Sequence, residues 1–329
     1  MKKILSLIFR LSVSLLIIGY TLKLISDKYG GLGNGMDHFI SVFSNASFVW
    51  IIPAFTLHFI GMGLMSLRWR TLLLAQGVNA GFGKLYSFNL MAAFFNNFLP
   101  STIGGDLIKA VESKRIVGDH TRSVMVIVIE RLTGLLALAV IALFAFVAKG
   151  TGSGGDESGS PEIFALLIAF GIVMIAVLSH PKISGKVIGI LKKILPSKIT
   201  GILERGANAI SVYYNYPRHL FIAIFISILF QFNMVMYYYF ISLGLGMNPG
   251  LIDFMTKAPM LIFLLMTVPS VNGIGVRTAV FGGLMRFPAA TALAVEAVDI
   301  GMRMCLGLLG GIVFLVYRRS SGQDVTEKE

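Results

Sequence analysis

Apolar runs of about 20 residues recur along this chain and constrain its fold more than any other feature. A helix needs about 20 residues to cross the 30 Å hydrocarbon core of a bilayer. Of the 329 residues, 56% are hydrophobic and 13% are charged, whereas about a quarter of the residues of a soluble domain are charged. The sequence therefore predicts an all-α polytopic membrane protein.

Six apolar segments are long enough to be transmembrane helices. They are residues 4–26, 48–67, 123–148, 162–180, 219–246 and 289–317. Most basic residues lie between these segments, so the net charge of +12 does not require a nucleic-acid partner. The single cysteine allows no intrachain disulfide, and the five histidines lack metal-ligand spacing, so we predict no metal and no cofactor.

The charges between the spans indicate which segments face the cytoplasm. Residues 181–218 carry seven Lys and Arg residues against Glu204 alone, so the positive-inside rule predicts a cytoplasmic stretch. Part of it, 187–195, can form an interfacial amphipathic helix. The Gly/Ser-rich and acidic residues 149–161 are predicted to be an external linker. We therefore expect a multi-pass protein of the cell (inner) membrane with both termini in the cytoplasm.

Two further apolar runs are too short to cross a bilayer. They stop at Pro-Ser-x-x-Gly breaks that begin at Pro100 and Pro269, an offset of 169 residues (269 − 100). Both are predicted to turn back as re-entrant hairpins, over about 86–108 and 251–288, that enter from opposite faces of the membrane.

The same offset divides the chain into two similar halves. Residues 1–148 and 162–329 would each contain span, span, hairpin and span, and Glu130 in the first corresponds to Asp299 in the second. Three spans are an odd number, so the second half would be inserted upside down. The sequence thus predicts the inverted-topology repeat found in many transporters.

The glycines after each break suggest an anion site. A helix that starts there has unsatisfied N–H groups and a positive dipole end, which suit a phosphate or a carboxylate. Lys109 follows the first break and Arg277 the second, and both add positive charge. We expect the two hairpins to meet at a central cavity that binds a lipid headgroup.

The acidic residues near the breaks have two interpretations each. Asp106 can bind an amine or a proton, or it can cap a helix or pair with Lys109. Glu130 and Arg131 can face a cavity or form a structural ion pair between spans. The helix face of Glu296, Asp299 and Arg303 can line the cavity or pair with Arg131 and Glu130.

Two groups of neutral residues also have alternative interpretations. Asn96, Asn97 and Asn272 can contact ligand or cap helices and form turns. The aromatic run 237–240 is more typical of a membrane-interface belt than of a binding site. The candidate substrate-binding residues are Asn96, Asn97, Pro100, Ser101, Gly104, Gly105, Asp106, Lys109, Glu130, Arg131, Pro269, Ser270, Asn272, Gly273, Gly275, Arg277, Asp299 and Arg303.

These motifs resemble one known family. The segment Asn-x-Phe-Leu-Pro before Gly-Gly-Asp106, the Glu130-Arg131 span and the late Pro-Ser…Gly-Ile-Gly-Val-Arg277 break are similar to the flippase-like transmembrane region of lysylphosphatidylglycerol synthases. The resemblance implies movement of lipid headgroups, aminoacylated phosphatidylglycerol in the named members. Thr278 stands where Glu is frequent, Ser101 where Gly is frequent, and Lys109 where Arg is common.

The resemblance implies a lipid transporter. We expect it to translocate an anionic or aminoacylated phospholipid, or a polyprenyl-phosphate-linked lipid. The chain ends at Glu329 without a soluble synthase domain, so it is not expected to make lysylphosphatidylglycerol by itself. Two alternatives are an enzyme with Asp106 and Glu130 as acid/base groups, and a scaffold that recruits a soluble synthase or glycosyltransferase through 181–218. A homo-oligomer or a partner synthase is compatible with each.

Overall fold

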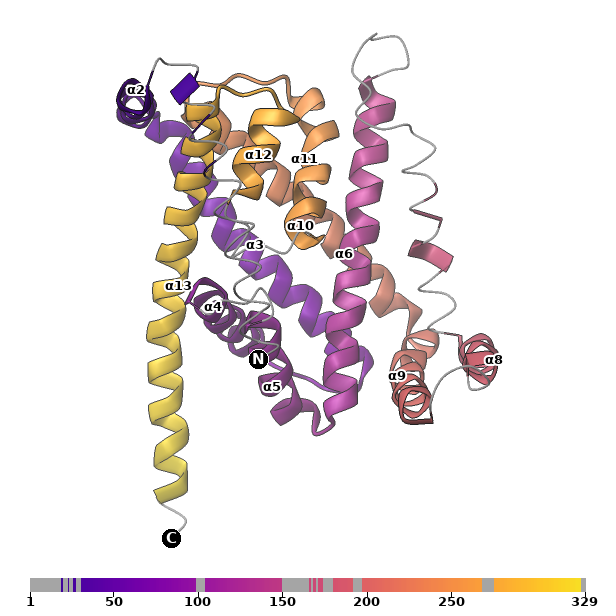
Figure 1. Cartoon of the computed structure of the whole chain (residues 1–329). Helices are drawn as coiled ribbons and strands as arrows, with labels where there is room; N and C mark the ends of the chain where they lie inside the picture. Colours follow the sequence, from indigo (N-terminus) through magenta and orange to yellow (C-terminus); the bar gives the residue numbers. More distant parts are fainter. Residues whose placement is uncertain are drawn as a thin grey trace. The chain divides into compact units, whose positions relative to one another are not determined.

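The chain folds into helices separated by short connections (Figure 1). The computed structural model describes residues 31–98, 104–149, 180–191, 197–267 and 275–326, together with 19, 23, 26–27, 166, 168–169 and 171–173. These residues contain no β-strand. The helices are α2 (Leu32–Ser44), α3 (Phe48–Ala75), α4 (Phe82–Phe98), α5 (Gly104–Val117), α6 (His120–Lys149), α8 (Pro181–Leu191), α9 (Ser197–Asn215), α10 (Pro217–Gly244), α11 (Leu251–Thr267), α12 (Val276–Gly283) and α13 (Ala289–Thr326).

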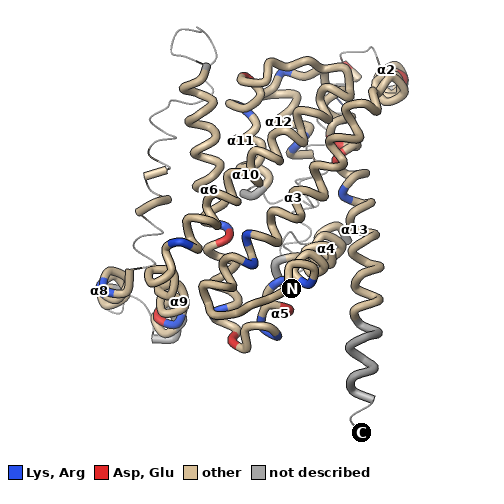
Figure 2. The backbone as a smooth tube through the Cα atoms, turned by 180° about the vertical axis from the view of Figure 1, so that it is seen from behind, with Lys and Arg blue, Asp and Glu red and all other residues tan. Residues whose placement is uncertain are grey.

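Four helices are long and apolar enough to cross a membrane. They are Phe48–Ala75, His120–Ala148, Pro217–Gly244 and Ala289–Tyr317. Most of their length carries neither acidic nor basic residues (Figure 2). Only 11% of the most apolar window of α3 is buried inside the protein, which suits a lipid-facing helix and not a soluble core. These helices confirm four of the six predicted spans; the other two, 4–26 and 162–180, lie largely outside the described residues.

The two predicted hairpin segments begin as short helices. α4 and α11 have 17 residues each, which is short for a transmembrane helix. Both end just before the predicted breaks, and residues 99–103 and 268–274 lie outside the described residues. The re-entrant path of both segments therefore stays a prediction.

Helix bounds recur at the 169-residue offset. α3 and α10 have 28 residues each and begin and end at corresponding positions, as do α4 and α11, and α6 and α13 begin at corresponding positions. Gly77 and Gly246 follow α3 and α10 with φ angles of 77° and 78°, the left-handed conformation that suits glycine at a helix end. The orientation of the two halves in the membrane stays a prediction.

The described helices belong to two compact units. Unit 1 comprises residues 1–61, 89–105 and 233–329, and unit 2 comprises residues 62–88 and 106–232. In unit 1, α13 packs against α12 and α2, and α11 packs against α12. In unit 2, α9 packs against both α6 and α8. Each unit buries its own group of charged side chains.

Aromatic and apolar side chains fill both interiors. In unit 1 the ring of Phe281 lies 5.8 Å from that of Tyr238 and 6.3 Å from that of Phe254. In unit 2 Trp69 is completely buried and its ring lies 6.3 Å from that of Phe88. These aromatic contacts join the helices that carry or flank the charged groups.

Candidate functional site

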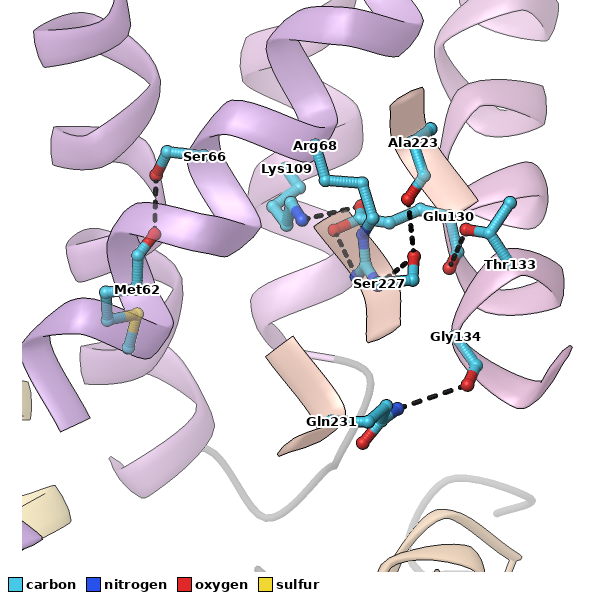
Figure 3. Close-up of polar contacts among 10 residues, drawn as sticks. All are labelled: Met62, Ser66, Arg68, Lys109, Glu130, Thr133, Gly134, Ala223, Ser227 and Gln231. Atoms are coloured by element: carbon cyan, nitrogen blue, oxygen red, sulfur yellow. Dashed lines mark hydrogen bonds and ion pairs between the residues drawn. The ribbon is translucent and has the colours of Figure 1, made fainter. Parts of the chain in front are cut away.

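Glu130 is the centre of a buried charge cluster in unit 2 (Figure 3). Its Oε1 lies 2.8 Å from Nη2 of Arg68, and its Oε2 lies 2.8 Å from Nζ of Lys109. The three side chains come from α6, α3 and α5, and each is at most 6% exposed at the residue level. We call these three residues the Glu130 cluster.

Neutral groups from α10 and α6 hold the Glu130 cluster in place (Figure 3). Arg68 Nη1 donates to the hydroxyl of Ser227 at 3.1 Å, and that hydroxyl donates to the carbonyl of Ala223 at 2.8 Å. Gln231 Nε2 donates to the carbonyl of Gly134 at 3.2 Å, one turn along α6 from Glu130. Two of the confirmed spans, α6 and α10, are therefore joined near the cluster.

The Glu130 cluster has more donors than acceptors. Two cations face one carboxylate, so the cluster carries a net charge of +1. Nε of Arg68 and the indole Nε1 of Trp69 are buried without a hydrogen-bond partner. Lys109 Nζ also lies 4.8 Å from the centre of the Trp69 ring, a cation–π geometry. A group that offers several acceptor oxygens would satisfy these donors.

Unit 1 contains a second cluster, around Asp299. Its Oδ2 lies 2.7 Å from Nε of Arg277 and 2.8 Å from Nη2 of Arg303. The hydroxyl of Tyr237 donates to Oδ1 at 2.9 Å, and Nε of Arg277 donates to the hydroxyl of Tyr238 at 3.1 Å. We call these five residues the Asp299 cluster.

The start of α12 is occupied by a carboxylate of the chain itself. Glu296 accepts hydrogen bonds from the backbone N–H of Gly275, and from the backbone N–H and hydroxyl of Thr278. Gly275 has a φ of 84°, which favours glycine. The N–H of Gly275, expected to hold a phosphate, is thus engaged by Glu296 in this structure. Within unit 1, Glu296 bonds the start of α12, and Asp299 pairs with Arg277 and Arg303.

Two asparagines before the first break bond the chain's own backbone. Oδ1 of Asn96 accepts from the N–H of Gly105 at 2.7 Å, which joins the end of α4 to the start of α5. A Cβ at Gly105 would meet the amide of Asn96, so a larger residue there would displace this side chain from its hydrogen bond. Asn97 Nδ2 donates to the carbonyl of Arg303 at 2.6 Å. These contacts match the capping interpretation of Asn96.

Several predicted site residues cannot be placed. Pro100, Ser101, Pro269, Ser270, Asn272 and Gly273 lie outside the described residues. Gly104 begins α5, but the side chain of Asp106 is outside the described part. Arg131 is exposed on the surface of unit 2, whereas its neighbour Glu130 is buried.

Sequence reasoning missed three members of the two clusters. The predicted span 48–67 leaves Arg68 just outside the membrane segment, but α3 continues to Ala75. Tyr237 and Tyr238 are each 1% exposed, so their assignment to an interfacial belt is wrong. A charged residue inside a continuous apolar helix is the signal that could have identified Arg68.

Most of the chain is similar to one known protein family. Residues 7–311 match the family described as the lysylphosphatidylglycerol synthase TM region. The chain belongs to this family. The resemblance inferred from the motifs is thereby confirmed, and it extends over nearly the whole chain.

A weaker match is to the UPF0104 membrane protein MJ1595 of Methanocaldococcus jannaschii. The two are 34% identical over 94 residues, which are 29% of this chain and 27% of that protein. The match therefore spans about a quarter of the relative's length. No solved structure matches the chain.

Proposed function

We propose that this family member is a lipid transporter, and that the Glu130 cluster binds the phosphate of an anionic lipid headgroup. The observation that carries the proposal is the surplus of buried positive charge and donors around one carboxylate. Phosphate oxygens accept strong charge-assisted hydrogen bonds from Arg and Lys. Arg68 would bind the phosphate through its guanidinium and Lys109 through its ammonium group.

The location of the cluster favours a lipid over a water-soluble anion. Arg68 and Glu130 lie within α3 and α6, two helices able to cross the membrane. Charged side chains inside transmembrane segments are costly and commonly mark substrate or ion pathways. A ligand that reaches such a cluster is most readily one that already resides in the bilayer.

The surroundings of the two clusters differ in charge, and this assigns them different roles. The Asp299 cluster also has two cations around one carboxylate, but Glu296 adds a second acid beside it by bonding Gly275 and Thr278 on either side of Arg277, so this region has no surplus cation. We therefore assign the phosphate to the Glu130 cluster. The acids of the second group suit the amine of an aminoacylated headgroup; a polyprenyl-phosphate lipid would use the first cluster alone.

The geometry favours transport over membrane-embedded catalysis. Each carboxylate oxygen of Glu130 lies 2.8 Å from a cation, an arrangement that stabilises the charged carboxylate and makes it a weak proton acceptor. Asp299 is likewise bonded by two arginines and a tyrosine. A general base must reach the proton that it removes. We propose a multi-pass location in the cell membrane with cytoplasmic termini, and membrane lipids as the partners.

The test is lipid movement in proteoliposomes containing fluorescent phosphatidylglycerol, read by quenching from outside. Lys109→Gln leaves Arg68 and Glu130 as a balanced pair, so the protein should fold while the surplus charge is gone. Losing a hydrogen bond to a charged group costs about 1.5–3 kcal/mol, and we expect the transport rate to fall about tenfold or more.

Lys114→Gln is the matched control, because Lys114 lies on the same helix but is exposed. It should transport at the wild-type rate. If folded Lys109→Gln also transports at that rate, the Glu130 cluster is not the headgroup site. If the wild type moves neither phosphatidylglycerol nor a polyprenyl-phosphate lipid, the transport proposal itself fails.

A further inference from the structure

The helices α8 and α9 form a small subdomain of unit 2 that the proposed transport site does not use. Both are seen nearly end-on in Figure 1, where α6 runs lengthwise, so they lie across the axis of this transmembrane helix. α8 buries Ser184 and Ile188 on the side that packs against α9. This is the orientation of a helix that lies along a membrane surface.

Specific contacts place α9 at the level where spans begin and end. Gln76 Nε2, at the end of α3, donates to the carbonyl of Ala209 at 2.8 Å. The hydroxyl of Tyr213 donates to the carbonyl of Leu72 at 3.2 Å, and burial raises the pKa of this hydroxyl, so it keeps its proton. α9 also ends two residues before α10 begins. The pair α8–α9 is therefore held at the membrane–water boundary.

One face of α8 exposes large apolar side chains. Ile183, Val187 and Ile190 are 41%, 41% and 62% exposed. Their spacing of i, i+4 and i+7 places them on one stripe of the helix. The stripe lies roughly 110° around the helix from the side that packs on α9, which Ser184 and Ile188 occupy.

Lysines border the apolar stripe. Lys182 and Lys186 are exposed and, at about 100° per residue, lie next to Ile183 and Ile190 around the helix. α8 carries blue segments and no red ones in Figure 2, in agreement with its lack of acidic residues. The amphipathic helix predicted over 187–195 thus begins earlier, at Pro181. Lys182 and Lys186 are therefore part of this helix and border its apolar stripe.

We propose that this face of α8, formed by Lys182, Ile183, Lys186, Val187 and Ile190, docks on the anionic lipid surface of the protein's own bilayer. The apolar stripe would enter the boundary between headgroups and acyl chains, and the lysines would contact anionic headgroups. Amphipathic helices of this kind bind through apolar burial together with attraction to anionic lipids. The proposal concerns a separate surface and stands whether or not the protein transports lipid.

The test uses the full chain in vesicles, with a fluorophore on a single cysteine. Cys305 is replaced by Ala, because it is a free exposed thiol. Ile190→Cys places the label in the stripe, and Gly185→Cys places it on the opposite side of α8, at the open hollow beside α9, where a Cβ has nothing within 4 Å. Vesicles of phosphatidylcholine, with or without phosphatidylglycerol, contain a nitroxide lipid as the quencher.

We expect nitroxide quenching at position 190, stronger with phosphatidylglycerol, and little at position 185. Lys182→Gln with Lys186→Gln should remove the dependence on phosphatidylglycerol. Each lysine near an anionic surface contributes about 1 kcal/mol, a factor of about five in the docked-to-free ratio.

Three results would overturn the proposal in protein that elutes as a single folded species. The label at 190 could be quenched by aqueous iodide but not by the nitroxide lipid, which would indicate a face for a protein partner. Quenching could be equal at positions 185 and 190. Finally, quenching at position 190 could be unchanged by phosphatidylglycerol and by loss of both lysines. The helix would then insert through its apolar residues alone and would not recognise anionic lipid.

Discussion

Glu130 and Asp299 lie 169 residues apart, the offset that separates the two Pro-Ser breaks, and each holds two cationic side chains at a buried position. In both clusters the cations come from more than one helix. Each carboxylate thus joins a transmembrane helix to neighbours in its own unit. The correspondence supports the proposed repeat by chemistry as well as by helix bounds.

Asp299→Asn should strongly destabilise the protein. The change leaves Arg277 and Arg303 without their carboxylate, and removing one partner of a buried ion pair costs about 3–5 kcal/mol. Thermal unfolding in detergent, followed by loss of monodisperse protein, measures the effect.

Asp253→Asn is the control for this prediction. Asp253 pairs with Lys257 at 3.0 Å on α11; Lys257 is buried, but the side chain of Asp253 is 42% exposed, so water reaches one end of the pair. Solvent screening weakens such a pair, so the unfolding temperature should fall clearly less than in Asp299→Asn. An equal fall in unfolding temperature for the two variants would show that the Asp299 cluster is not a main source of the stability of unit 1.

Glu130→Gln should be destabilising too, and a second change should repair part of the loss. The single variant buries Arg68 and Lys109 with no counter-charge, at a cost of about 3–5 kcal/mol. Adding Lys109→Gln leaves one buried cation instead of two, so the double variant should unfold at a higher temperature than Glu130→Gln alone. A double-mutant cycle measures the coupling between the two residues.

The same cycle tests whether surplus charge binds the headgroup. The double variant keeps the wild-type net charge of the cluster, whereas Lys109→Gln alone is neutral. Retention of phosphatidylglycerol should therefore be greater for the double variant than for Lys109→Gln, as measured by native mass spectrometry. Weaker retention by the double variant would show that net charge does not govern headgroup binding and that Glu130 is needed to hold Arg68 in place.

The inverted orientation of the two halves predicts that residues 149–161 and the basic stretch 181–218 face opposite sides of the membrane. Cysteines at Asp156 and at Lys186, each in a Cys305→Ala background, should react with an impermeant thiol reagent from opposite sides of the membrane. Residues 149–161 are predicted to be external and the basic stretch cytoplasmic. Labelling of both positions from one side would contradict the inverted repeat.

A helix must be about 20 residues long and apolar to cross a bilayer, and both properties can be read from the sequence. Hydropathy therefore predicted the four spans that the structure also contains. Charges inside those spans identified Glu130 and Asp299 for a similar reason, since an intramembrane acid needs a partner. The short apolar runs were also recognised, because length excludes a span.

The identity of the partners could not be predicted in the same way. Lys109 is separated from Glu130 by 21 residues, and local helix spacing detects pairs only three or four residues apart. A hydropathy scale gives tyrosine one value whether its side chain faces lipid or a buried acid. It therefore could not show that Tyr237 and Tyr238 face Asp299. Glu296 was placed on the correct helix face, but only the fold shows that it bonds the start of α12.

Close packing between α13 and the second half of α4 gives a last prediction. A Cβ built on Gly310 would lie 1.9 Å from the carbonyl oxygen of Leu90, so any side chain there must push the backbones apart. Gly301, on the same helix, has nothing within 4 Å of the corresponding Cβ. Gly310→Ala should therefore destabilise unit 1, by about 1–3 kcal/mol as for other overpacked sites.

Gly301→Ala should act in the opposite direction. Alanine is favoured over glycine inside a helix by about 1 kcal/mol, and no neighbour opposes it here. The two variants differ in what the added methyl group contacts. The unfolding temperature should therefore be below the wild-type value for Gly310→Ala and above it for Gly301→Ala. A Gly310→Ala protein as stable as Gly301→Ala would mean that α13 and α4 are not in backbone contact at this position.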